Sequence, residues 1–143
     1  LIIFNYFKHY NRKMAIPASE KILVPLLRYL GDGELHTITS STLEMAKFFK
    51  LTKEEKWRFF EMRRPKKGVP TLTASHIYIR TAEAVGILHK KGLLRYAPGM
   101  QREGVFQISG HGLNLIQNTG IMSNKLSDTR VKFAKDQILN HKK

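Results

Sequence analysis

Apolar side chains recur at helical spacing near the start of the chain, where they predict a helix. The expected helix begins after Ser19, a residue type that caps helices, and ends at the glycine-rich turn 31–33. Pro25 stands inside it and should kink or loosen it, because proline lacks the backbone N–H that a helix interior uses. The apolar positions that define this helix are Ile22, Leu23, Leu26, Leu27 and Leu30.

Two further helices are predicted in the next thirty or so residues. The stretch 36–38 is typical of a short extended piece, and we expect Thr39 or Ser40 to cap a second helix behind it. Thr52 and Glu55 have the spacing of a capping box, which predicts the start of a third helix.

A long helix that leads into a hairpin is predicted in the second half. The helix should run from about residue 73 to residue 91, where Gly92 ends it. Its apolar stripe is Ile77, Thr81, Ala84 and Leu88, with Ala74 and Val85 at the margin. Alternating residues predict strands at 94–96 and 105–108, and Ser109 should cap a last short helix.

Helices first, then a long helix followed at once by a hairpin, is the order of a winged helix-turn-helix. We therefore predict a mainly α fold with a small β-hairpin, of the α+β class, over residues 14–120. Residues 1–13 are expected to be a non-native or disordered leader. Residues 121–143 form a basic tail whose weak helical pattern leaves a docked helix, a dimer helix and a linker open.

The excess of positive charge indicates an anionic binding partner. The chain has 25 Lys and Arg against 11 Asp and Glu, a net charge of +14. Residues 61–102 contain nine of the basic residues and two acidic ones, so they hold half of that excess in less than a third of the length. A local field of this kind attracts double-stranded DNA through its phosphates, whereas a solvated basic surface is the alternative.

Candidate DNA contacts fall into three groups. Arg63, Arg64, Lys66 and Lys67 precede the long helix and are expected to clamp phosphates, or else to be a solvated loop. Near the helix start, Thr73 and Ser75 could cap it or donate to a phosphate. The remaining candidates, on the long helix and at the hairpin tip, are His76, Arg80, Lys90 and Arg102. For Arg80, pairing with a carboxylate inside the domain is as good an interpretation as contact with DNA.

The sequence contains little that indicates a catalytic or a metal site. Without cysteine there is no thiol chemistry or Cys-based zinc site, which suits a reducing cytoplasm. The six histidines are dispersed, and no glycine-rich phosphate loop is present. We expect a non-enzymatic chain with no cofactor and no metal, and its short apolar runs exclude a membrane partner.

Several short motifs, in order, resemble the amino-terminal domain of Mrr-type restriction endonucleases. The residues that carry the resemblance are Met14 to Pro17, 26–33, 51–55, Arg80, Ala84, Leu88, Gly92 to Leu94, 104–109 and Gly112. Glu83, where the family usually has an aromatic residue, and Lys91, where it has a small one, depart from the pattern. The resemblance implies a winged-helix domain that delivers a separate nuclease domain, absent from these 143 residues, to modified DNA.

Three functions follow as hypotheses. The leading one is a double-stranded-DNA-binding module of an Mrr-like restriction system, reading DNA that is methylated or not, and cleaving nothing itself. The second is a stand-alone winged-helix transcription regulator, which would need a homodimer that the tail could supply. The third is a winged-helix protein-interaction domain, because a fold does not settle a function.

Overall fold

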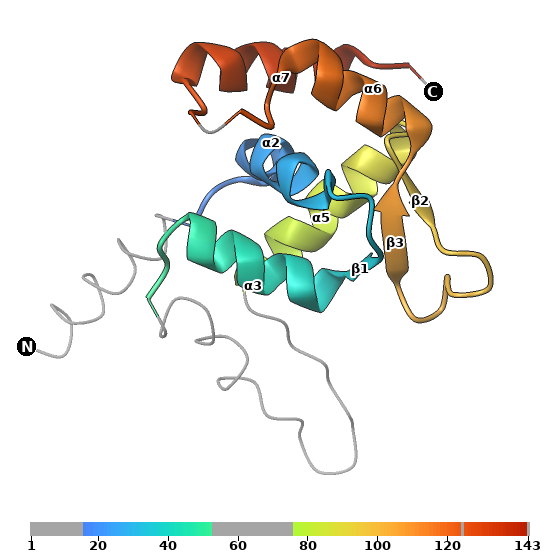
Figure 1. Ribbon diagram of the computed structural model, residues 1–143. Helices are drawn as coiled ribbons and strands as arrows, with labels where there is room; N and C mark the ends of the chain where they lie inside the picture. The colour runs from blue at the N-terminus through green and yellow to red at the C-terminus, as the bar shows by residue number, and fades with distance from the viewer. Residues whose placement is uncertain (1–15, 53–75, 124, 143) are drawn as a thin grey trace, which may run out of the picture.

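The computed structural model describes residues 16–52, 76–123 and 125–142, which form five helices and a three-stranded sheet (Figure 1). In chain order these elements are α2 (Ser19–Leu30), β1 (His36–Thr37), α3 (Ile38–Phe48), α5 (His76–Lys90), β2 (Leu94–Tyr96), β3 (Val105–Ile108), α6 (Gly110–Thr119) and α7 (Asp128–Asn140). The expected mainly helical α+β class is therefore confirmed. The expected leader 1–13 and the helix expected after Thr52 lie outside the described residues.

Helix α2 is the centre of the core. It packs against α3 and α5 on one side and against α6 and α7 on the other (Figure 1). All side chains from Ile22 to Leu27 are buried, Pro25 among them, and the helix continues through that proline. The residue before the helix is Ala18, which makes no side-chain cap, so the prediction that Ser19 is the cap was wrong.

Thr37 caps α3, two residues before the first of the two caps predicted from the sequence. Its Oγ1 accepts from the backbone N–H of Ser40 at 3.1 Å, and Ser40 Oγ accepts from the backbone N–H of Thr37 at 3.2 Å. This reciprocal pair is a capping box. The expected caps, Thr39 and Ser40, lie inside the helix because β1 ends at Thr37 and the chain turns there.

The sheet has the order β1-β3-β2, and both pairings are antiparallel. Leu94 pairs with Ile108 and buries its side chain with it, while the neighbouring pair Arg95 and Gln107 faces outward. The two strands predicted from alternation, 94–96 and 105–108, are thus confirmed. The hairpin that joins them contains Gly99 and Gly104 at positive φ, a conformation that glycine adopts without strain.

The predicted apolar stripe of the long helix is buried in α5. Ile77, Thr81, Ala84 and Leu88 each have no exposed surface, and they face α2 and α3. Ser109 caps α6 as predicted, its Oγ accepting from the backbone N–H of Gly112 at 3.1 Å.

The basic tail forms a docked helix. In α7, Ala134 and Ile138 are fully buried and join the same apolar core as α2. Arg130 reaches back from α7 and donates to the backbone oxygen of Gly120 at 3.2 Å, at the end of α6. No helix in the described ranges is long and apolar enough to cross a bilayer.

Candidate nucleic-acid interface

Three of the candidate DNA contacts share one face of α5. At 100° per residue, His76, Arg80 and Lys90 fall within about 80° of arc, with Lys90 on the side away from the buried stripe and Arg80 at the edge of that stripe. They are spread along the helix rather than clustered, because fourteen residues at 1.5 Å each separate the first from the last by about 21 Å. We call this exposed side, with Ile79, Glu83 and Gly86, the outer face of α5.

Arg80 is engaged within its own helix. Its guanidinium lies 3.3 Å from the carboxylate of Glu83, one turn further along, and the two side chains are 43% and 46% exposed. The structural pairing weighed from the sequence is therefore present, but on the surface rather than inside the domain. An exposed pair of this kind contributes little stability, so an incoming phosphate can replace the carboxylate.

Two positions on the outer face, Ile79 and Gly86, carry no polar side chain. Gly86 is exposed, and a Cβ atom built on it would meet nothing within 4 Å. Ile79, about two helical turns earlier on the same face, is 46% exposed. The backbone of α5 is thus open to close approach by a partner at Gly86.

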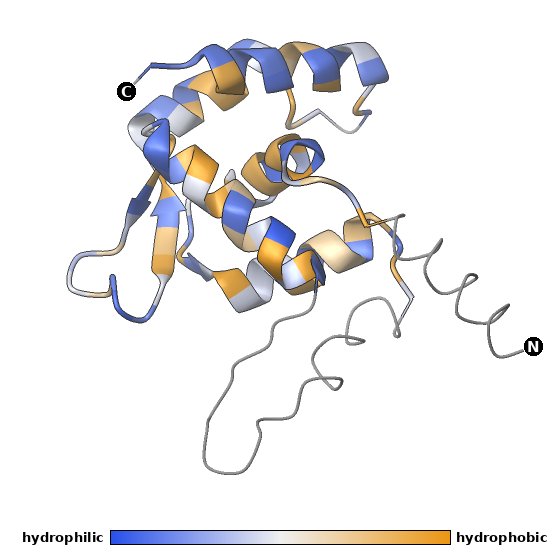
Figure 2. Ribbon diagram, turned by 180° about the vertical axis from the view of Figure 1, so that it is seen from behind, coloured by the Kyte–Doolittle hydropathy of each residue, from blue (hydrophilic) through white to orange (hydrophobic). Residues whose placement is uncertain are grey.

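The hairpin lies beside the carboxyl end of α5, as Figure 2 shows from behind. Arg102 is exposed in its loop, the position expected of the hairpin-tip candidate. On the outward side of the sheet, Arg95 donates to Gln107 Oε1 at 3.1 Å, and Gln107 in turn donates to the backbone oxygen of Gly33 at 2.8 Å. Arg95 remains exposed while it is held in this way.

Lys91 has a structural partner. Its Nζ donates to the backbone oxygen of Leu139 in α7 at 2.6 Å, so this cation fastens the end of α5 to the tail helix. Lys90 and Lys91 both belong to the basic stretch 61–102, and the neighbouring sequence does not show that Lys91 has a partner while Lys90 is exposed.

The other candidates, Arg63, Arg64, Lys66, Lys67, Thr73 and Ser75, lie outside the described residues. Glu83 was not paired with Arg80 from the sequence, although its spacing of three from Arg80 indicates a surface pair. Among the described residues no three His, Asp or Glu side chains gather in a way that could hold a metal ion.

No match to this chain was found among protein-family models, curated proteins or solved structures.

Proposed function

We propose that this chain binds double-stranded DNA as a winged-helix domain, with α5 as the recognition helix and the β2–β3 hairpin as the wing. The observation that carries the proposal is the outer face of α5, which presents His76, Arg80 and Lys90 beside a hairpin with an exposed Arg102. Packing supports it as well, since α2, α3 and α5 contact one another and α5 leads directly into the hairpin. An α-helix fits the major groove of B-DNA, where arginine can contact guanine.

Phosphate contacts would supply most of the affinity. Lys90 and Arg102, at the end of α5 and in the hairpin loop, are exposed cations that can neutralise phosphates on either side of the groove. Arg80 is the residue that can read a base, once it exchanges Glu83 for DNA.

The role within a restriction system is part of the same proposal. Three of the glycines that carry the resemblance to the Mrr-type domain lie where the backbone favours glycine: Gly92 and Gly104 have positive φ, and Gly112 lies against the backbone of Leu93. These three positions support the proposal that the chain shares its fold with the Mrr-type domain. The proposal also includes a preference for methylated DNA, which the residues of the outer face would determine.

Titration of a labelled duplex of about 20 base pairs, unmethylated and methylated, at several salt concentrations tests the proposal. We expect log K to fall steeply and linearly with log salt, with a slope of several units. The double variant Lys90→Ala/Arg102→Ala should bind more weakly with a shallower slope, by about one unit per lost phosphate contact. Lys132→Ala removes one exposed positive charge from α7 and is the control for the loss of a surface charge elsewhere on the fold; it should change neither.

Absence of duplex binding at low salt would overturn the proposal, as would an equal loss in the Lys132→Ala control. The protein-interaction hypothesis has one observation in its favour, which is the exposed Ile79 beside Gly86 on the outer face. A partner protein bound there would be retained at high salt, because apolar contacts are not screened.

A further inference from the structure

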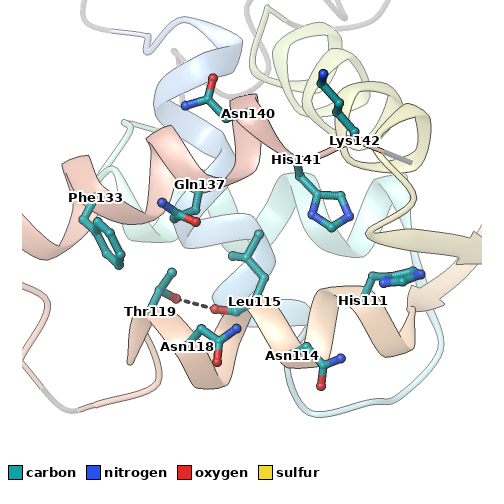
Figure 3. A pocket seen from close by; sticks show the side chains of 10 residues that line it. All are labelled: His111, Asn114, Leu115, Asn118, Thr119, Phe133, Gln137, Asn140, His141 and Lys142. Carbon is teal, nitrogen blue, oxygen red and sulfur yellow. Dashed lines mark hydrogen bonds between the residues drawn. The ribbon is translucent and has the colours of Figure 1, made fainter.

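A groove of about 490 Å³ lies between α6 and α7 (Figure 3). The side chains of Phe133 and Gln137 on α7 and of His141, which directly follows that helix, are four residues apart and point toward α6. Leu115 and His111 face them from α6. The groove therefore has an aromatic and amide end and an imidazole end.

Two histidines define the imidazole end. The ring centroids of His111 and His141 lie 5.7 Å apart, and the rings are tilted by 55°. Nε2 of His141 is buried and has no hydrogen-bond partner among the described residues. A buried polar nitrogen without a partner is costly, so a turn of the His141 ring that brings this nitrogen to an acceptor atom of a ligand in the groove is favoured.

The charge of the groove selects an anion. None of the described residues that line it is Asp or Glu, and the chain as a whole has a net charge of +14. A metal ion held in place by the protein needs carboxylates or further imidazoles, which are not gathered among the described residues. An oxyanion accepts hydrogen bonds from imidazole nitrogens without such help.

The opposite end selects a planar heterocycle. Phe133 is 49% exposed, so its ring is open to stacking. Gln137 has an exposed side-chain amide, which can pair with the edge of a base through one donor and one acceptor. The volume of the groove lies within the range of about 300–1,000 Å³ that is usual for small-ligand sites.

We propose that the groove between α6 and α7 binds a nucleoside monophosphate. The phosphate accepts from the imidazole N–H groups of His111 and His141 at the rim of this ring pair, the base stacks on Phe133, and Gln137 hydrogen-bonds to the edge of the base. The nucleotide can be free or an unpaired 5′-phosphorylated nucleotide of a DNA strand. In both ribbon views α6 and α7 lie at the end of the molecule away from the hairpin loop (Figures 1 and 2), and no residue of α5 lines the groove.

The whole chain titrated with dAMP, followed by backbone amide shifts in NMR spectra, tests the proposal. Saturable shifts are expected at Phe133, Gln137, His141 and His111. Phe133→Ala should weaken dAMP binding about fivefold or more, since stacking of one base contributes on that scale. Deoxyadenosine and inorganic phosphate, each with half of the chemistry, should both bind more weakly than dAMP.

Two exposed residues of α6 outside the groove provide matched controls. Leu113→Ala removes an apolar side chain and Gln117→Ala removes an amide, and neither should change dAMP affinity. A 5′-phosphorylated single strand is titrated in the same way. If it shifts the same amides and binds with higher affinity than dAMP, the ligand is a strand end; if its affinity is equal or lower, the ligand is the free nucleotide.

Three results would overturn the proposal. They are no saturable shift with dAMP, equal affinity for dAMP and inorganic phosphate, and shifts confined to α5 and the hairpin. Duplex titration of Phe133→Ala keeps the two proposals distinguishable, because the loss of the groove should leave binding of a blunt, unphosphorylated duplex intact.

Discussion

Arg80 and Glu83 form an ion pair at 3.3 Å in the middle of the outer face of α5. The pair places a negative charge on the helix that we propose enters the major groove. That carboxylate has two effects, since it holds the guanidinium in the absence of DNA and repels phosphates as DNA approaches. Binding therefore exchanges one partner of Arg80 for another.

Removing the charge of Glu83 should tighten duplex binding. In Glu83→Gln, Arg80 is released and one repulsion of phosphates is lost, so we expect the affinity at low salt to rise about threefold to tenfold. Fluorescence anisotropy with a labelled duplex measures this change. Glu20→Gln, the same change at an exposed residue in the first turn of α2, controls for net charge and should give a smaller effect. Equal increases in both variants would show that Glu83 is not at the interface.

Gly86 offers a test in which stability and binding move in opposite directions. Because the helix interior disfavours glycine and a Cβ here meets nothing within 4 Å, Gly86→Ala should stabilise the fold by about 0.5–1 kcal/mol. Duplex affinity should fall, and it should fall further in Gly86→Leu, where the larger side chain holds the DNA away from the helix. Chemical unfolding and anisotropy measure the two quantities. Unchanged affinity in Gly86→Leu would exclude close approach at this position.

Lys90 and Lys91 are neighbours with different expected roles. Lys90→Ala should weaken duplex binding and leave the unfolding free energy nearly unchanged, because the side chain is exposed. Lys91→Ala should lower the unfolding free energy by about 1 kcal/mol, since it removes the hydrogen bond to the backbone oxygen of Leu139. Its effect on binding should be the smaller of the two. The reverse pattern would contradict the assignment of Lys90 to the interface.

The contrast between these two lysines shows what a sequence pattern can predict. Periodicity located the buried stripe of α5 and both hairpin strands, because side-chain burial repeats with the period of the element. The cap of α3 was missed because Thr37 also ends β1, and the pairing of that strand with β3 joins residues far apart in the chain. The partner of Lys91 and the groove between His111 and His141 likewise depend on where α7 docks.

Gly112 is predicted to be the glycine least tolerant of substitution among those described. A Cβ on it would lie 2.4 Å from the backbone oxygen of Leu93 and 2.5 Å from a side-chain carbon of Ile108. Gly112→Ala must push α6 away from the sheet, and we expect a loss of about 1–3 kcal/mol in unfolding free energy. Gly110→Ala, in the same helix with nothing within 4 Å of its Cβ, is the control and should not destabilise. Similar unfolding midpoints for the two variants would contradict the packing seen here.

Asp32 should make the fold sensitive to acid. Its Oδ1 lies 2.9 Å from Nε2 of His36 and accepts from the backbone N–H of Glu34 at 2.8 Å. Partial burial raises the pKa of Asp32, but the hydrogen bonds from His36 and Glu34 and the charge of His36 outweigh it and hold that pKa below its ordinary value. A carboxyl whose pKa is lowered by folding stabilises the fold above its unfolded-state pKa, near 4, and loses that contribution as the pH falls through the folded-state pKa.

Thermal unfolding between pH 6 and pH 2 measures this contribution. Asp32→Asn keeps an oxygen that can accept from Glu34 but cannot ionise, so its unfolding temperature should be lower at pH 6 and should fall less below pH 4 than that of the wild type. Glu34→Gln changes the neighbouring exposed carboxylate and should keep the wild-type acid dependence. If Asp32→Asn and the wild type lose stability in parallel as the pH falls, the contacts of Asp32 with His36 and Glu34 do not stabilise its ionised form.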